Sequence, residues 1–553
     1  MSPFSLTRLG EWPRLEDSLC FLVVASPISK AATNIALGLT IAIFLRDWAR
    51  RRRRPRATPL DGAILVWVLA EVLSGVTSVD PLRSFRDLRN IGHWSTYYFL
   101  VWGIAAGANL RRLENLWLFA GGVCAAQALL QSSIGFDLQG DEPVIPTGFF
   151  NGHLELGHYM VMLLGLAIPR WRESQDRTEG LLLLLAIIAF GGALVVSGGR
   201  GPWLAFVVVA SSWAILQRSW RALSMLGLVA ALQLTFFLRQ PEGLESFYRS
   251  YLTFEPEPAA VAEDRVASNL WRLTMWREGM RLFALRPLTG TGVETTGELS
   301  QDFHTPFREF GVAHLHSNYF EILMTCGFLG LAAFLLFLMG ALWVLGGALR
   351  EPGGGSRAAP RPSTNPAAFA ALAAVLTQIV HGFTHFTFGS APIQVGFYVA
   401  LGLGVGAVER RRDEAPAREL RTGALELAWA AVTIALLIAI EPWLSEQRLF
   451  SLLLATGAAV DLAAARLRNR RWMGGGSDLV PLALAGAFAF VVLASALLLW
   501  PLPTGDALAL RTIVAAAGPF GLAYASTRLA MFWLIRRSGS PISATVESRA
   551  AGR

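Results

Sequence analysis

The sequence is short of charge, of lysine and of cysteine. Charged residues make up 16% of its 553 residues and hydrophobic residues 53%, whereas a soluble protein of this length usually carries more charge. Cys20, Cys124 and Cys326 each lie in an apolar stretch, far from one another, so neither a disulfide framework nor a zinc site is expected. Lys30 is the only lysine, and arginine carries nearly all of the basic charge.

What the sequence has instead is long apolar runs, such as LLLLLAIIAFGGALVV at 181–196 and AFAFVVLASALLLW at 487–500. A helix of about 20 apolar residues crosses the hydrocarbon core of a bilayer and satisfies its own backbone groups there. The sequence therefore predicts an all-α polytopic membrane protein. The apolar segments lie at roughly 19–29, 32–45, 62–79, 91–107, 114–134, 156–169, 181–197, 202–216, 222–238, 317–348, 367–388, 393–408, 424–440, 448–464, 479–500 and 508–535.

The spacing of these segments predicts four regions. Residues 1–238 form the first transmembrane part of a core, with about nine spans, and 317–408 add about three more. Between them, 239–316 is a large polar loop with amphipathic helices. Residues 409–553 form a C-terminal extension of about four spans.

The arginine clusters predict the orientation. They fall on alternate loops, as the positive-inside rule requires when the N-terminus lies in the cytoplasm. The long loop at 239–316 then lies on the outer, periplasmic face of a bacterial inner membrane. The same clusters suit membrane orientation better than nucleic-acid binding, so no nucleic-acid partner is expected.

Three residues at the outer boundary are candidates for chemistry. Arg200 lies in the tight turn SGGRGPW between two apolar segments, Arg272 lies on a stretch of helical periodicity from Asn269 to Leu285, and His316 precedes a long apolar segment. Arginine binds phosphate in a bidentate manner, and histidine can accept a proton near neutral pH. The alternatives are a snorkelling anchor for Arg200, one solvated charge among several for Arg272, and a helix start near His316 that is capped by Ser317 or Asn318.

Further residues are secondary candidates. His314 competes with His316, although residues two apart on a helix point about 200° away from each other. His385 follows His381 by four residues and either joins a pocket or bonds between helices. Arg86 and Arg277 could hold phosphate, or simply face lipid headgroups and solvent. His314 and His316 have no carboxylate or cysteine cluster beside them, so no metal site is expected.

Two other motifs carry less information. Glu71 lies inside an apolar segment, where a carboxyl group is energetically costly. Glu71 is therefore a functional candidate, although the sequence indicates no partner for it. TGTGV at 289–293 contains GxG but follows no strand, which argues against a dinucleotide site.

The order of four motifs resembles the O-antigen ligase and O-antigen polymerase superfamily. The motifs are PTGFFNGH (146–153), SGGRGPWLA (197–205), the loop with Arg272, Trp276 and RPLTGTGV (286–293), and HSNYFEILMTCGFLG (316–330). The resemblance covers roughly 19–408. It implies a GT-C-type helical bundle of about twelve core transmembrane helices, so the four C-terminal spans exceed the usual core. It also implies a metal-independent glycosyltransferase without a cofactor.

In that resemblance Arg200 and Arg272 bind the diphosphate of the donor, and His316 is the catalytic residue. The donor would be a glycan on undecaprenyl diphosphate, and the acceptor a glycolipid or glycan at the outer face of the inner membrane. We expect a ligase-like transferase. The alternatives are a polymerase or protein O-glycosylating enzyme of the same superfamily, a membrane transporter, and a non-catalytic assembly protein. A transporter would show internal repeats and broken helices at mid-membrane.

Overall fold

The computed structural model describes residues 14–50, 57–87, 92–135, 145–219, 265–303, 312–350 and 365–413. The chain divides into two compact units, Met1–Glu441 and Pro442–Arg553, and every described residue belongs to the first. The predicted segment at 222–238 and the four predicted C-terminal spans lie outside the described residues.

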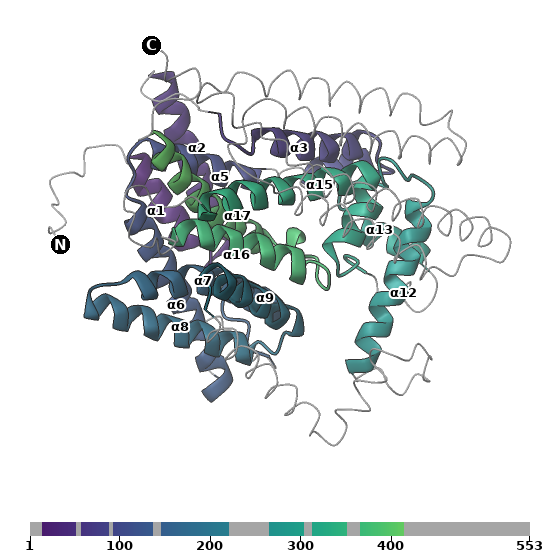
Figure 1. The fold of residues 1–553 in the computed structure, drawn as a ribbon. Coiled ribbons are helices and arrows are strands. Elements are labelled where there is room, and N and C mark those ends of the chain that lie inside the picture. The colour runs from purple at the N-terminus through teal and green to yellow at the C-terminus, as the bar shows by residue number, and fades with distance from the viewer. Residues whose placement is uncertain are drawn as a thin grey trace, which may run out of the picture. The chain divides into compact units, whose positions relative to one another are not determined.

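The described part is built from helices, as the sequence predicts (Figure 1). The helices of at least seven residues are α1 (Leu15–Ala25), α2 (Lys30–Ala49), α3 (Asp61–Val76), α4 (Pro81–Asp87), α5 (Ser95–Ala105), α6 (Leu110–Ile134), α7 (His153–Glu173), α8 (Arg177–Val196), α9 (Arg200–Leu216), α12 (Arg265–Phe283), α15 (Asn318–Arg350), α16 (Pro366–His381) and α17 (Ala391–Asp413). Every predicted apolar segment that falls on described residues overlaps one of these helices. The segment predicted at 367–388 gives a shorter helix, because α16 ends at His381.

Four of these helices are long and apolar enough to cross a membrane. They are Leu110–Ile134, Arg177–Val196, Asn318–Leu349 and Ala391–Arg411. The helix Arg200–Leu216 and α16 are apolar but shorter. The chain is therefore a multi-pass membrane protein, and the total of about sixteen spans stays a prediction.

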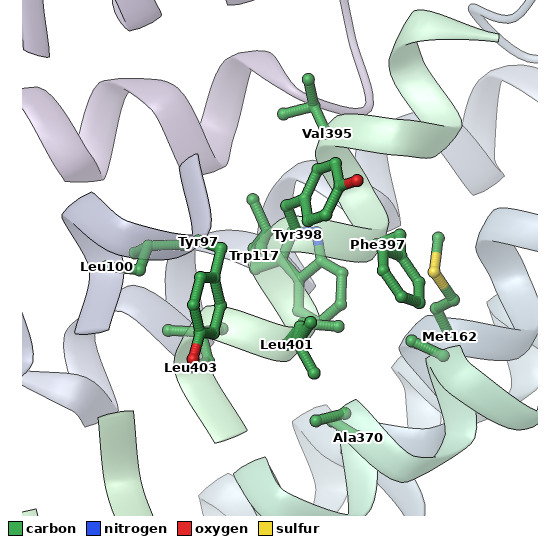
Figure 2. Packing of buried hydrophobic residues seen from close by; sticks show 14 of the residues in the cluster. Tyr97, Leu100, Trp117, Met162, Ala370, Val395, Phe397, Tyr398, Leu401 and Leu403 are labelled. Atoms are coloured by element: carbon green, nitrogen blue, oxygen red, sulfur yellow. The ribbon is translucent and has the colours of Figure 1, made fainter. Parts of the chain in front are cut away.

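The centre of the bundle is α17, which packs against α5, α7 and α16. Phe397, Tyr398 and Leu401 of this helix are fully buried, and Figure 2 shows them among side chains of neighbouring helices. The opposite case is α8, whose Leu182 and Ile188 are 62% and 61% exposed. Leucine-rich surface of this kind is costly in water and favourable against lipid, so α8 has the surface of a lipid-facing helix.

The long helix α15 is interrupted at Gly327, where φ is 67° and ψ is −168°. Hydropathy alone predicts a continuous span at 317–348, because the apolar run does not change at this position. The break leaves backbone groups without helical partners, and the loop at 287–292 supplies them. The Thr291 and Gly292 N–H groups donate to the carbonyls of Met324 and Thr325, both at 2.9 Å.

Glycines make this contact possible. A Cβ atom on Gly290 would collide with the Thr325 carbonyl, and one on Gly327 would collide with the Leu288 carbonyl. Only residues without side chains let two backbones approach so closely. Gly290 of TGTGV thus packs its loop into the break of α15, which gives this glycine a structural role.

The two ends of α7 lie in different surroundings. Near its C-terminal end, buried Arg170 pairs with Glu114 at 3.5 Å and with Glu179 at 2.6 Å. The ends of neighbouring helices carry further pairs, since Arg111 of α6 also pairs with Glu179 of α8 and Arg112 of α6 pairs with Glu16 of α1. We call this the ion-pair end. The N-terminal end of α7 lies beside α9 and α16 (Figure 1), and histidines gather there.

Candidate active site

Three histidines from two separate segments meet at the start of α15. His314 and His316 precede the helix, and His385 lies in the linker between α16 and α17. The ring centroids of His314 and His316 are 4.3 Å apart, and each lies 5.9 Å from the centroid of His385. We call these residues the histidine cluster. The expected divergence of His314 and His316 on a helix is wrong, because the helix begins only at Asn318.

Asn318 fixes the linker that carries His385. Its backbone N–H donates to the Gly382 carbonyl at 2.7 Å, and its side-chain Nδ2 donates to Thr387 Oγ1 at 2.8 Å. Its Oδ1 accepts the Phe388 N–H at 3.2 Å. The Ser317 hydroxyl also points to Gly382. These side chains therefore bond to the linker, and this clamp places His385 beside His316.

A second pair of histidines lies beneath the cluster, between α7 and α16. The Nδ1 atoms of His158 and His381 are 3.0 Å apart, and both residues are fully buried. The ring of His381 stacks on that of His385, with centroids 5.4 Å apart and planes inclined by 17°. His381 therefore pairs with a residue of another helix, whereas His385 lies in the linker, and five histidines form one continuous group.

Arg272 approaches this group from α12. It precedes Trp276 by one turn on the same helix, and residues four apart share a helix face. The Trp276 ring stacks on Phe320 with centroids 4.5 Å apart, and its indole N–H donates to the Leu315 carbonyl at 2.7 Å. Docking of Trp276 therefore directs Arg272, which is half-buried, toward the histidine cluster.

The electrostatics of the cluster favour neutral imidazole rings. Burial lowers the pKa of His316 to about 3, with further lowering from His314 and the charge of Arg272. Burial also lowers the pKa of His385 to about 3, with smaller contributions from its neighbouring histidines and from Arg272. Since a buried ring avoids charge and Arg272 repels a second cation, His316 is unprotonated at pH 7.

Arg200 begins α9, directly after the turn in which Gly198 has a φ of 61°. The predicted break between two apolar segments is therefore present. Its neighbour Gly201 packs against His381 and Thr384 so closely that a Cβ atom there would collide with both. The start of α9 therefore lies against the end of α16, next to the second histidine pair. The Arg200 side chain itself is exposed.

Several of the buried polar atoms without hydrogen-bond partners lie on residues of the five-histidine group or on the neighbouring turns of α7 and α16, and others lie elsewhere in the described helices. The atoms of the first group are Glu155 Oε2, His158 Nε2, His316 Nδ1, Gln378 Nε2, Gln378 Oε1, His381 Nε2 and His385 Nδ1. Buried polar groups in folded proteins are nearly always hydrogen-bonded, and leaving one unpaired costs about 1–3 kcal/mol. A polar ligand with several hydroxyl or phosphate oxygens would satisfy such groups. Across the described ranges, no group of three or more His, Cys, Asp or Glu side chains is placed to hold a metal ion.

Comparison with known proteins identifies the region that carries these residues. Residues 184–335 match the family described as O-antigen ligase. The chain contains an O-antigen ligase domain. Its matched stretch includes Arg200, Arg272 and His316, and the resemblance predicted from the sequence is confirmed.

A curated relative supports the same assignment at a distance. The O-antigen ligase of Salmonella typhimurium is 22% identical over 249 residues, which are 43% of this chain and 61% of the relative. The chain therefore spans about three fifths of the length of this curated relative.

The remaining arginine candidates of the O-antigen ligase domain and its surroundings lie apart from the histidine contacts. Arg277 is exposed on α12, adjacent in sequence to the docked Trp276. Arg86 is exposed on α4, a helix whose Ser84 hydroxyl donates to the Val293 carbonyl. Among the described contacts, none joins either arginine to the cluster.

Sequence reasoning did not single out His158, Glu155 or His153. His158 and Glu155 lie near the N-terminal end of α7, and the charge of Arg272 reaches the ring of His153 at its start. A signal was available, because polar and ionisable residues inside an apolar segment are rare and usually face a bundle interior. The histidine at the end of PTGFFNGH marks the point where these residues begin.

Proposed function

We propose that this chain is a membrane glycosyltransferase that moves a glycan from undecaprenyl diphosphate to an acceptor hydroxyl. The observation that carries the proposal is a neutral, half-buried His316 held beside Arg272, among buried polar atoms that lack partners. A base, a fixed cation and unsatisfied polar groups are what a sugar diphosphate and a hydroxyl acceptor require.

Arg200 and Arg272 are assigned to the donor. A guanidinium group pairs with two phosphate oxygens at once. Negative charge on the diphosphate increases as the glycosidic bond breaks, so a fixed positive charge stabilises the transition state more than the bound donor. Exposed Arg200 is accessible to the phosphate of a lipid-borne donor, and half-buried Arg272 is assigned to the phosphate oxygen on which negative charge develops.

His316 is assigned to the acceptor. The acceptor oxygen forms a new bond to the anomeric carbon of the donor sugar. The bond between that carbon and the diphosphate oxygen breaks, and undecaprenyl diphosphate leaves with the electron pair. The imidazole of His316 takes the proton of the acceptor hydroxyl. His314 and His385 line the space around the ring, and burial lowers the pKa of both.

The relative from Salmonella typhimurium is named O-antigen ligase, which favours a glycolipid acceptor over a second lipid-linked glycan. The test is reconstitution of the purified chain with a labelled undecaprenyl-diphosphate glycan, with and without a lipopolysaccharide core acceptor. We expect label on the core and release of undecaprenyl diphosphate. Longer lipid-linked chains without added core would indicate a polymerase. Binding of the donor without any chemical transfer would reject the glycosyltransferase proposal.

The histidine cluster is proposed to face the periplasm, and the ion-pair end the cytoplasm. Arg112 at the start of α6 pairs with Glu16 of α1, and Arg111 and Arg170 meet at Glu179 of α8. Basic residues that flank membrane spans are retained in the cytoplasm. The cluster lies toward the other end of α7, where His158 meets His381.

Reporter fusions test this orientation. An alkaline phosphatase fusion near residue 260, in the proposed periplasmic loop, is expected to be active, and one near residue 358 inactive, because the enzyme folds only outside the cytoplasm. Green fluorescent protein fusions at the same positions should give the reverse. Equal behaviour of the two positions would contradict the orientation.

A further inference from the structure

His316 has a backbone conformation that few residues other than glycine adopt. Its φ is 51°, in the left-handed region. A residue without local side-chain stabilisation pays a conformational cost there, and such conformations persist where the surrounding structure fixes them. What fixes this one is the peptide before it, at Leu315.

Leu315 is held on three sides. Its N–H donates to Glu321 Oε2 at 2.6 Å, and its carbonyl accepts the indole N–H of Trp276 at 2.7 Å. Its side chain is fully buried against α12, where a Cβ atom on Gly279 would collide with it. Three residues after Leu315, Asn318 is bonded to the linker, so the chain is anchored on both sides of His316.

Glu321 serves this peptide from inside the protein. The residue is 3% exposed, and its second oxygen accepts the hydroxyl of buried Thr296. Buried carboxyl groups are costly unless their oxygens are hydrogen-bonded. Here both oxygens have partners, and these partners join α15, the segment before it and α13 (Thr296–Leu299).

We propose that Glu321 and Trp276 are positioning residues that hold the His316 ring in place through the Leu315 peptide. The inference rests on the proposed function, in which His316 is the base. Trp276 lies one turn after Arg272 on α12, so its hydrogen bond also sets the distance between the donor-binding arginine and the base. Neither residue needs to touch substrate to affect the reaction.

Trp276→Phe is the first test. Phenylalanine keeps an aromatic ring to stack on Phe320 and removes the indole N–H. We expect kcat for transfer to fall about 10- to 100-fold, the size expected when a catalytic group is misplaced by about 1 Å. The matched control is Trp117→Phe. It also removes a buried indole hydrogen bond, to Tyr159 at 2.8 Å, but in the α6–α7 contact; its kcat should be unchanged.

Glu321→Ala and Glu321→Gln form the second pair. Glutamine retains an oxygen for the Leu315 N–H and an amide that can donate to Thr296, so it should restore most of the kcat lost in the alanine variant. Equal losses in both variants, or a Trp276→Phe variant with the kcat of wild type, would overturn the positioning role of Glu321 and Trp276.

A readout without catalysis separates the two proposals. The rate at which diethyl pyrocarbonate modifies His316, measured by peptide mass spectrometry, should rise in Trp276→Phe and not in Trp117→Phe, because a released ring is more accessible. If wild type lacks transfer activity but the modification rates of the two variants differ as expected, the proposed function fails and the positioning role of Trp276 stands. If His316 is modified at the same rate in Trp276→Phe as in wild type, the positioning role is overturned whatever the transfer activity.

Discussion

His316→Ala is expected to abolish measurable glycan transfer while leaving donor binding nearly intact. The substitution removes the proposed base, and a positioned general base contributes about 10²–10⁴-fold to a rate. Arg200 and Arg272 remain, so the diphosphate should still bind. The measurement is an in vitro transfer assay together with a donor-lipid binding assay on the same preparation.

His314→Ala is the matched comparison, since the two rings are neighbours. The Nδ1 atom of His314 accepts the backbone N–H of His316 at 3.2 Å, so we expect a moderate loss of transfer in His314→Ala. An inactive His314→Ala with an active His316→Ala would mean that His314 is the base. Full activity in both variants would remove the catalytic role of the motif.

The pH dependence examines the same role in the intact chain. Because the base must be unprotonated and burial lowers the pKa of His316 from 6.5 to about 3, the active form persists as the pH falls. The profile of kcat/KM reports the free enzyme and should stay flat from about pH 8 to about pH 5. An acidic limb near 6.5 would show that the base titrates as an ordinary exposed histidine.

Arg272→Ala and Arg200→Ala are each expected to lower kcat/KM for transfer by about 10²–10³-fold, the range seen when a preorganised donor to a developing anion is removed. Membrane insertion and thermal stability should be retained. Lysine at either position should restore only part of the activity, because an ammonium group lacks the bidentate geometry of guanidinium. Donor binding should weaken in parallel.

Arg281→Ala is the control for the loss of positive charge on α12. Arg281 is exposed near the end of that helix and pairs with Glu278 at 3.3 Å. The Arg281→Ala variant should transfer glycan at the rate of wild type. If Arg281→Ala loses as much activity as Arg272→Ala, the effect reflects net charge on the helix. Full activity in both Arg200→Ala and Arg272→Ala would exclude them as the donor site.

Hydropathy predicted the helices well because a segment in lipid must be apolar and helical. It could not predict where α15 breaks. The run around Gly327 is uniformly apolar, and the groups that repair the break come from the loop around Gly290. The end of α16 at His381 was missed for the same kind of reason, since the apolar character continues into a linker that Asn318 holds in another conformation.

The candidate site was predicted by residue type and only partly by place. Arginine in a turn and histidine before a span indicate phosphate and proton chemistry wherever they occur. The meeting of His316 with His385 depends on hydrogen bonds between segments far apart in the chain, which no local pattern encodes. His158 lies near the start of α7, and its partner His381 comes from another helix, α16.

The linker between α16 and α17 has a consequence for how the protein is made. Membrane helices are synthesised and inserted from the N-terminus onward, and His316 emerges well before the residues that bond to Asn318 and bring His385 alongside. A nascent chain that stops short of this linker therefore possesses both arginines, His314 and His316, yet the proposed base has no finished surroundings. Catalytic competence arrives late in synthesis, when most of the bundle is already in the bilayer.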